Sequence, residues 1–354
     1  MKKLLISTGG TGGHVIPAEI IGEHLKDIYE INFSTDLRGF DYFKSKKNKT
    51  VIINSPRLNL DILFPLKIIK IFYLTIKSIL FLKKEKIFLV ISTGGYMSLP
   101  ICIAAKILGL KIFLLEPNLI LGKGNKFFLN FSKKIICYSN NIKNFPKKFI
   151  SKLEIISPLV DKNFYEIKKK ETINDIFCLL VAGGSQGAKI FDEIVKEAIV
   201  KLSKKHTIRV IQQTKIENKK NLQIFYEKFK VKNEIFHFEK NFYNLINQAD
   251  LCISRAGATS LAEISIMNKP FIAIPLPTAK DDHQMENAKF YEAAGCCWVI
   301  NQKTLDKDKL NIILDNILNK NSDYTDKKSN LKKLNYQNSW NDVNQKIKEI
   351  INEN

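Results

Sequence analysis

A glycine-rich loop near the amino end carries residues suited to binding an anion. The sequence TGGTGGH occupies residues 8–14, and Val15, Ile16 and Pro17 follow it at the expected start of a helix. Glycine lets a backbone pass close to a ligand, and a helix amino end presents N–H groups and about half a positive charge. The loop has neither the third glycine of a dinucleotide fingerprint, where Val15 stands, nor the lysine of a P-loop. It predicts an anion-binding loop of another kind, with a tight turn that binds nothing as the alternative.

Two loops in the second half repeat this arrangement. The sequence GGSQGA, residues 183–188, follows an apolar run, and Ser185 adds a hydroxyl donor to the backbone donors. The sequence SRAGATS, residues 254–260, leads into a further predicted helix. The amides of Ala258, Thr259 and Ser260 could hold a diphosphate there, and Glu263, one turn later, could accept hydrogen bonds from ribose hydroxyls. The alternative for Glu263 is a solvated helix charge.

Three more polar segments follow predicted strands. Residues 281–284 (DDHQ) and Asn287 place amide and imidazole groups at a helix start, which suits sugar hydroxyls. Helix capping by Asp281 or Asp282 is the alternative, and the two roles are compatible. The sequences TGGY at 93–96 and EPN at 116–118 complete the set. All of these segments are expected at the carboxyl ends of strands, where open α/β sheets bind ligands.

The elements that position these loops alternate between strand-like and helix-like patterns. Strands are predicted at residues 4–7, 31–34, 51–53, 87–92, 111–115 and 135–138, with helices starting near residues 17, 65, 98 and 121. A charged segment, residues 161–174, is predicted to be a linker. The rhythm then restarts with strands at 176–182, 208–212, 234–236, 251–254, 271–274 and 298–300, before a polar helical tail from 323 to 354. This α/β pattern predicts two Rossmann-like, doubly wound parallel-sheet domains in series, facing a cleft.

Composition narrows the class of protein. The 354 residues, 45% of them hydrophobic, suffice for two cores. The net charge of +21 favours an anionic partner, but only four of the 56 basic residues are Arg. Arg is the residue that proteins prefer for bidentate hydrogen bonds to phosphates and to base edges, so its scarcity disfavours nucleic acid as the partner. An anionic membrane surface, in contrast, attracts Lys by about 1 kcal/mol per side chain. The six Cys are scattered outside CxxC pairs and are expected to be small buried hydrophobes in a reducing compartment.

One segment is suited to a lipid surface. Residues 64–86 combine many large apolar side chains with six Lys, a pattern typical of a basic amphipathic helix lying on anionic lipid; the apolar residues include Ile68, Ile69, Phe72, Tyr73, Ile76, Ile79, Leu80 and Leu82. The Lys residues interrupt the apolar run too often for a membrane-spanning helix. The apolar stretch at the start of the chain is too short for the hydrophobic region of a signal peptide. The alternative is a core helix with a solvated Lys edge.

Taken in order along nearly the whole chain, the motifs resemble those of the MurG family, UDP-GlcNAc:muramyl-pentapeptide pyrophosphoryl-undecaprenol N-acetylglucosaminyltransferases of GT-B fold. The matching segments are GGTGGHVIPA at 9–18, GGY at 94–96, GGSQGA at 183–188, SRAGATSLAE at 254–263 and DHQ at 282–284. The resemblance implies an inverting transfer of GlcNAc from UDP-GlcNAc to the 4-hydroxyl of the lipid-linked muramyl pentapeptide, in peptidoglycan synthesis.

The resemblance also implies roles for individual residues. His14 is implied as the general base that accepts the proton of the attacking hydroxyl, with Glu116 as the alternative base and a purely structural role for His14 also open. A base typically contributes roughly 10²–10⁴-fold, and a histidine is populated in its neutral form near pH 7. The implied substrate-binding residues are Thr11, Gly12, Gly13, Asn118, Ser185, Glu239 beside the uracil, Ala258, Thr259, Ser260, Leu261, Ala262, Glu263 and Gln284, the last for the GlcNAc hydroxyls.

Two departures from the family pattern stand out. Pro117 replaces a usual Gln after Glu116, and Val160 replaces a usual Arg at the domain junction. A phosphate contact is therefore expected to be missing, and Lys162 is a candidate to replace it as a point charge. If Lys162→Ala leaves donor affinity unchanged, that replacement is wrong.

No cofactor or metal is expected, because the single DxD sequence, residues 306–308, lies in a Lys-rich helical stretch. The predicted domains are residues 1–158, facing acceptor and membrane; residues 159–335, binding UDP-GlcNAc; and a helix in 336–354 packing back on the first. The expected location is peripheral, at the cytoplasmic face of the inner membrane, with other wall-synthesis proteins as possible partners. The alternatives are a GT-B enzyme with another acceptor, a UDP-GlcNAc 2-epimerase, a non-catalytic nucleotide-sugar sensor and a nucleic-acid-binding protein.

Overall fold

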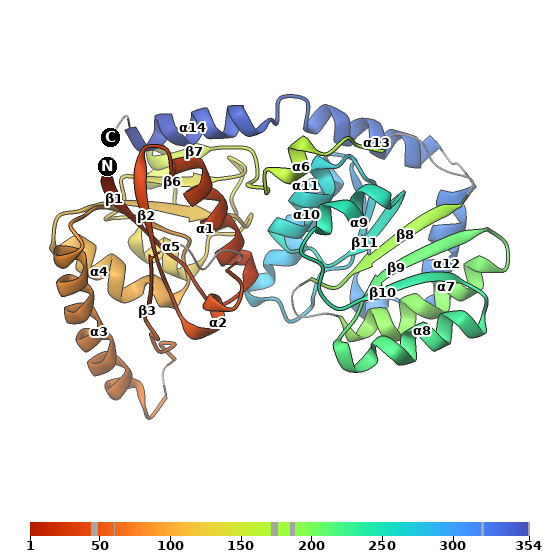
Figure 1. The fold of residues 1–354 in the computed structure, drawn as a ribbon, viewed down its shortest axis with the longest axis horizontal. Helices are drawn as coiled ribbons and strands as arrows, with labels where there is room; N and C mark the ends of the chain where they lie inside the picture. Colours follow the sequence, from red (N-terminus) through yellow and green to blue (C-terminus); the bar gives the residue numbers. More distant parts are fainter. Residues whose placement is uncertain (44–48, 60, 171–175, 185–187, 320–321, 353–354) are drawn as a thin grey trace. The chain divides into compact units, whose positions relative to one another are not determined.

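The computed structural model describes residues 1–43, 49–59, 61–170, 176–184, 188–319 and 322–352. The chain forms two compact units, residues 1–160 with 339–354, and residues 161–338 (Figure 1). The division after Val160 lies two residues beyond the predicted boundary. Ser185, predicted to contact the diphosphate, lies outside the described residues.

The first unit is built on a parallel sheet of seven described strands in the order β3-β2-β1-β4-β5-β6-β7. The order reverses direction between β1 and β4, and such a switch point is where open sheets bind ligands. The strands are β1 (Lys2–Ser7), β2 (Tyr29–Thr35), β3 (Lys49–Ile52), β4 (Ile87–Ser92), β5 (Lys111–Glu116), β6 (Lys134–Cys137) and β7 (Leu153–Ile155). The helices are α1 (Gly12–Leu25), α2 (Leu37–Phe40), α3 (Phe64–Lys84), α4 (Leu99–Ile107), α5 (Lys123–Phe128) and α14 (Trp340–Asn352).

Both faces of this sheet are covered, so its central strands are almost continuously apolar. On β1, Leu4 and Ile6 pack into a cluster with residues of α1 and α14, whereas Leu5 packs on the opposite face with residues of α3 and α4. This continuous apolar character is the reason that the sequence predicts most of the strands. The short β7 was not predicted, because its three residues follow a Lys-rich segment with little apolar character.

Helix α1 begins earlier than predicted. It starts at Gly12, and Pro17 lies inside it rather than at its first turn. Glycine has a low helix propensity and proline favours a first turn, which is why the sequence pattern placed the start too late. Pro17 has no N–H to donate to the carbonyl of Gly13, so the first turns of α1 lack one backbone hydrogen bond.

The carboxyl-terminal helix α14 belongs to the first unit and packs against α1 (Figure 1). Val343, Ile347 and Ile350 enter the same apolar cluster as β1. The ring of Trp340 stacks on His24 of α1, with 3.8 Å between ring centroids. Residues 339–354 therefore complete the core of the first unit.

The second unit is a parallel sheet of six described strands in the order β10-β9-β8-β11-β12-β13, with its switch point between β8 and β11. The strands are β8 (Phe177–Ala182), β9 (Ile208–Gln213), β10 (Lys232–Phe236), β11 (Leu251–Ser254), β12 (Phe271–Ala273) and β13 (Cys297–Val299). The helices are α6 (Asn163–Glu166), α7 (Lys196–Ser203) after a π-helical turn (Phe191–Val195), α8 (Lys219–Lys228), α9 (Phe242–Gln248), α10 (Ala258–Ile266), α11 (His283–Ala293), α12 (Lys307–Leu318) and α13 (Ser322–Leu334).

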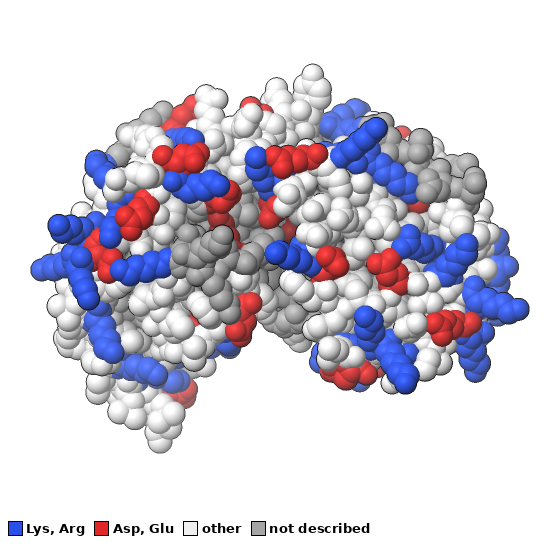
Figure 2. Space-filling model, in the orientation of Figure 1, with Lys and Arg blue, Asp and Glu red and all other residues white. Residues whose placement is uncertain are grey.

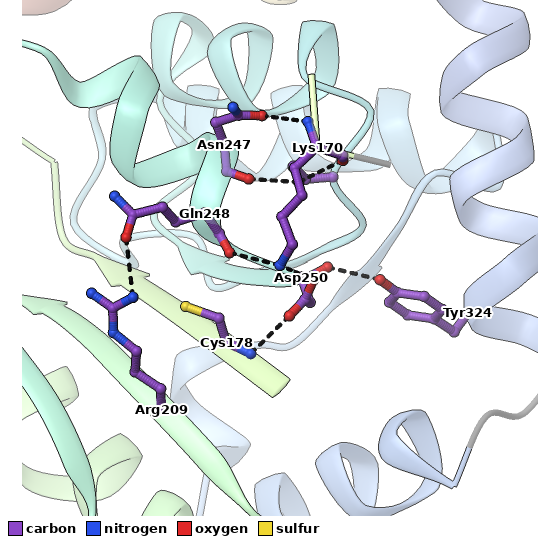
Figure 3. Close-up of polar contacts among 8 residues, drawn as sticks. Lys170, Cys178, Arg209, Asn247, Gln248, Asp250 and Tyr324 are labelled. Carbon is purple, nitrogen blue, oxygen red and sulfur yellow. Dashed lines mark hydrogen bonds and ion pairs between the residues drawn. The ribbon is translucent and has the colours of Figure 1, made fainter. Parts of the chain in front are cut away.

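The prediction of a linker at residues 161–174 is wrong for its described part, which is attached to the second unit. The ammonium group of Lys170 lies 3.0 Å from a carboxylate oxygen of Asp250, whose other oxygen accepts a hydrogen bond from the N–H of Cys178 at 2.9 Å (Figure 3). Lys169 donates to the carbonyl of Ile266 at 2.7 Å. A buried carboxylate needs such partners, and the Lys-rich composition concealed this anchoring role.

Helix α3 exposes apolar side chains. Ile71, Thr75, Ser78 and Leu82 form its buried face. Its solvent side carries Leu66, Ile69, Phe72, Tyr73 and Leu80, each more than half exposed. Among the described residues, no helix combines the length and the apolar composition that crossing a bilayer requires. All six cysteines are buried thiols, as predicted.

Candidate functional site

His14 sits at the switch point of the first sheet. Thr11 is the residue before α1, and its carbonyl accepts hydrogen bonds from the N–H of His14 and of Val15 at 3.0 and 3.2 Å. The Nδ1 atom of His14 lies 2.8 Å from the carbonyl oxygen of Thr93, directly after β4. Because a carbonyl only accepts, Nδ1 carries the hydrogen and Nε2 carries the lone pair of the neutral ring. This is the tautomer in which Nε2 can act as a base.

The glycines of the first loop fall into two groups. Gly10 has a φ of +84°, and a Cβ atom there would lie 2.8 Å from Cε of Met97. Gly10 is therefore required by the fold. At Gly13, in the first turn of α1, the described neighbour that a Cβ atom would meet is Oγ1 of Thr11, at 3.7 Å. No described residue requires glycine at this exposed position, which fits a surface that a substrate approaches.

Asp36 holds this loop in place, and the sequence patterns did not reveal it. It is buried directly after β2, and its Oδ1 atom accepts hydrogen bonds from the N–H of Gly10 at 2.7 Å and of Gly39 at 2.9 Å. Its Oδ2 atom accepts from the guanidinium of Arg38 at 3.0 and 3.2 Å. An acidic residue immediately after a buried strand was the only available signal.

Glu116, predicted as the alternative base, is instead surrounded by donors. One carboxylate oxygen accepts from the N–H and the side-chain amide of Asn118, both at 3.2 Å. The other accepts from the N–H of Gly122 at 2.8 Å and the amide of Asn125 at 3.0 Å. Burial raises the pKa of Glu116, and these hydrogen bonds oppose the rise. The geometry favours a carboxylate that orders the loop from Asn118 to Asn125 over a base.

The amino end of α10 is the clearest anion-binding feature of the second unit. Ala258 is its first residue, and the N–H of Leu261 donates to the carbonyl of Gly257 in its first turn, at 3.0 Å. The N–H groups of Ala258, Thr259 and Ser260 therefore have no partner within the helix. The buried hydroxyl of Thr259 makes no hydrogen bond to any described residue.

Leu261 and Ala262, two predicted binding residues of α10, have buried side chains. The N–H of Leu261 is used within the helix, and the side chains of Leu261 and Ala262 are buried. Both therefore support the helix from its core side. Glu263 is half-buried one turn from the helix start.

Gln284 connects α11 to the loops beside α10. Its side-chain oxygen accepts from the N–H of Leu276 at 2.9 Å and of Ala256 at 3.3 Å. Its amide N–H groups are what the side chain can offer to a sugar hydroxyl. Neither Asp281 nor Asp282 caps α11 in the expected way: both have left-handed φ values, 54° and 59°, and the Asp282 side chain makes no capping hydrogen bond.

Two other predicted residues, Glu239 and Lys162, have partners close to them in the sequence. Glu239 is exposed and accepts from the N–H of Asn241 at 2.8 Å, ahead of α9, and neighbouring Phe238 is 76% exposed. Lys162 pairs with Glu166 at 2.7 Å, and Val160 is buried. The described residues contain no group of three or more His, Cys, Asp and Glu side chains arranged to hold a metal ion.

Arg255 lies three residues before the start of α10. Its guanidinium is buried and donates to the carbonyls of Ile274 at 3.0 Å and Pro275 at 3.3 Å. Burial lowers the pKa of Arg255 to about 10, which leaves it charged at neutral pH. A helix amino end with three amides that have no partner within the helix favours a diphosphate.

Comparison with known proteins identifies the family of this chain. The model of the glycosyltransferase family 28 N-terminal domain matches residues 4–137, and that of the family 28 C-terminal domain matches residues 178–343. The chain belongs to glycosyltransferase family 28. The predicted resemblance is therefore confirmed.

Relatives within family 28 share one description. A UDP-N-acetylglucosamine–N-acetylmuramyl-(pentapeptide) pyrophosphoryl-undecaprenol N-acetylglucosamine transferase of Pelagibacter ubique is 47% identical over 100% of this chain and 99% of its own length. The protein of the same name from Rickettsia bellii is 34% identical over 88% of this chain and 89% of its own length.

Solved structures agree on the fold. MurG of Acinetobacter baumannii superposes with a TM-score of 0.79 at 24% identity, covering 99% of this chain and 100% of its own. A glycosyltransferase of Rickettsia africae gives 0.67 at 13% identity, covering 100% and 99%. The prediction of a GT-B fold with two Rossmann-like parallel sheets is confirmed.

Proposed function

We propose that this family 28 enzyme transfers GlcNAc from UDP-GlcNAc to the 4-hydroxyl of a lipid-linked N-acetylmuramyl pentapeptide, inverting the anomeric centre. The observation that carries the proposal is the 47% identity to a transferase of that description across the whole chain. The loops at the strand ends of both sheets supply groups that suit each part of the reaction.

The second unit is proposed to bind the donor. The amides of Ala258, Thr259 and Ser260 and the hydroxyl of Thr259 suit a diphosphate, and the amide of Gln284 suits a GlcNAc hydroxyl. Glu263 is proposed to hold ribose. As UDP departs, negative charge grows on the diphosphate, and preorganised amides stabilise it without reorganising. We therefore propose that turnover needs no metal and persists in a chelator.

The first unit is proposed to activate the acceptor. The Nε2 atom of His14 accepts the proton of the attacking hydroxyl while the carbonyl of Thr93 holds Nδ1–H. This hydrogen bond fixes the ring orientation and stabilises the imidazolium that forms. Glu116 acts as a positioning residue for the loop that carries Asn118.

Helix α3 is proposed to bring the enzyme to the lipid-linked acceptor at an anionic membrane surface. Its exposed apolar face and the Lys residues of its last turn, Lys83 and Lys84, suit insertion among lipid headgroups. On the face shown in Figure 2, basic side chains are spread widely and mixed with acidic ones, which favours this local interpretation over a nucleic-acid groove. Location at the cytoplasmic face of the inner membrane and contact with other wall-synthesis proteins follow from the same proposal.

Vesicle flotation tests the membrane contact. Ile69→Ser with Phe72→Ser is expected to reduce flotation with vesicles containing phosphatidylglycerol, since each side chain is more than 60% exposed on α3. Ile216→Ser is the matched control, because Ile216 is 70% exposed in the second unit. Equal flotation of all variants rejects α3 as the contact.

The transfer assay tests the function. Incubation with radiolabelled UDP-GlcNAc and the lipid-linked muramyl pentapeptide is expected to move label into the lipid fraction with equimolar release of UDP. UDP release without the acceptor indicates hydrolysis, epimer formation indicates an epimerase, and binding without turnover indicates a sensor. Any of these in place of transfer refutes the proposal.

A further inference from the structure

Arginine is rare in this chain, so its placement is informative. Four of the 56 basic residues are Arg. Arg255 is buried against backbone carbonyls, and Arg209 bonds to Gln248 at 3.1 Å and pairs with Glu234. Those two have partners within the second unit. The other two, Arg38 and Arg57, gather at one tyrosine of the first unit.

That tyrosine is Tyr96, the last residue of the GGY motif. The guanidinium carbon of Arg57 lies 5.3 Å from the Tyr96 ring centroid, and that of Arg38 lies 5.9 Å away. Arg38 also donates to the Tyr96 hydroxyl. Two cations therefore lie beside one tyrosine, Arg57 within cation–π distance of its ring and Arg38 at its hydroxyl group.

The sheet explains why these residues meet. Arg38 follows β2, Arg57 follows β3 and Tyr96 follows β4. With β1, these strands are neighbours in the order β3-β2-β1-β4, and all pairs are parallel. Their carboxyl ends share one edge, the edge that also carries His14 at the start of α1.

The cluster formed by Arg38, Arg57 and Tyr96 carries uncompensated positive charge. Asp36 neutralises Arg38, but both of its oxygens are already engaged, one by Arg38 and one by the N–H groups of Gly10 and Gly39. Arg57 is exposed and forms no ion pair within the described part of the chain. Arg57 therefore adds one positive charge beside Tyr96 that a bound anion would compensate.

We propose that Arg57 and Arg38, supported by Tyr96, bind the diphosphate of the lipid-linked acceptor. Guanidinium forks match phosphate oxygens in pairs, which suits two adjacent phosphates. The acceptor is favoured over UDP because the cluster shares its edge with His14, the proposed base for the acceptor hydroxyl, and because Asp36 ties Arg38 to Gly10 in the same loop. The assignment to the acceptor rests on the proposed function.

Steady-state kinetics of Arg57→Gln test the site. The acceptor KM is expected to rise about tenfold or more, the effect of losing one charged hydrogen-bonding partner, while the donor KM changes less than about twofold. Lys26→Gln is the control: it removes one exposed cation at the far end of α1, where Lys26 pairs with Glu23, and is expected to change neither constant. Tyr96→Phe keeps the ring and is expected to raise the acceptor KM less than Arg57→Gln does.

Two further arms identify the ligand. Arg57→Gln is expected to make no difference with an acceptor analogue whose diphosphate is replaced by an uncharged linker, and inorganic pyrophosphate is expected to bind wild type more tightly than the variant in calorimetry. A raised donor KM with an unchanged acceptor KM assigns the cluster to UDP and overturns the proposal, as does an unchanged KM for both. If wild type transfers no GlcNAc yet pyrophosphate binding still depends on Arg57, the proposed function and the acceptor assignment both fail and only an anion site remains.

Discussion

Replacing Gly13 with alanine is expected to affect stability and catalysis differently. Among the described residues, a Cβ atom at Gly13 would have Oγ1 of Thr11 as its one neighbour within 4 Å, at 3.7 Å. Alanine in a helix is favoured over glycine by up to about 1 kcal/mol. Gly13→Ala is therefore expected to leave the free energy of unfolding unchanged or to raise it by that amount.

The same methyl group is expected to impair catalysis. It projects from the first turn of α1, beside His14, into the surface where the substrate is proposed to lie. Overpacking typically costs 1–3 kcal/mol, so kcat/KM is expected to fall by about fivefold to 150-fold.

Gly10→Ala is the matched control. Gly10 has a φ of +84° and a Cβ atom there would lie 2.8 Å from Cε of Met97, so this variant is expected to lose about 1–3 kcal/mol of stability. Urea unfolding of the three proteins and a transfer assay at substrate concentrations below KM measure both quantities. If Gly13→Ala is as stable as wild type and equally active, no substrate approaches this turn and the reasoning is wrong.

Three other substitutions test separate parts of the account. His14→Ala is expected to lower kcat by about 10²–10⁴-fold with little change in UDP-GlcNAc affinity, and near-normal kcat would place the base elsewhere. Glu116→Gln puts an N–H group where only donors face the side chain, so urea unfolding is expected to show a loss of about 1–3 kcal/mol. Burial lowers the pKa of His24 to about 4, below its unfolded value of 6.5, so the unfolded chain binds more protons between those values. Wild-type stability is therefore expected to be complete above pH 6.5 and to fall by up to about 3 kcal/mol on acidification to pH 4, whereas His24→Phe, which retains an aromatic ring against Trp340, should lack this component.

The sequence predicted those parts of the fold that depend on local patterns. Buried parallel strands such as β1 and β4 are apolar along their length, and the loops that follow them are rich in glycine, so the strand rhythm and the loop positions could both be predicted. The start of α1 could not, because Gly12 and Gly13 have low helix propensity and are nevertheless helical. The attachment of residues 163–170 to the second unit could not be predicted either, because the partner of Lys170 is Asp250, 80 positions later.

The candidate site was predictable in its location but not in its internal contacts. Residue types indicated His14 and the amino end of α10. The structure adds the hydrogen bond to Thr93 and the hydroxyl of Thr259, which has no hydrogen-bond partner among the described residues. Leu261 and Glu116 were assigned by resemblance, and their surroundings favour support of helix and loop. Asp36 and the arginine pair escaped notice because their meaning lies in contacts between the ends of different strands.

A crystal structure with UDP-GlcNAc bound tests the central claim, that the amino end of α10 holds the donor's diphosphate. The account predicts phosphate oxygens within hydrogen-bonding distance of the amides of Ala258, Thr259 and Ser260, a new partner for the Thr259 hydroxyl, and a sugar hydroxyl beside the amide of Gln284. A diphosphate bound away from these amides, with the Thr259 hydroxyl still lacking a partner, would contradict it.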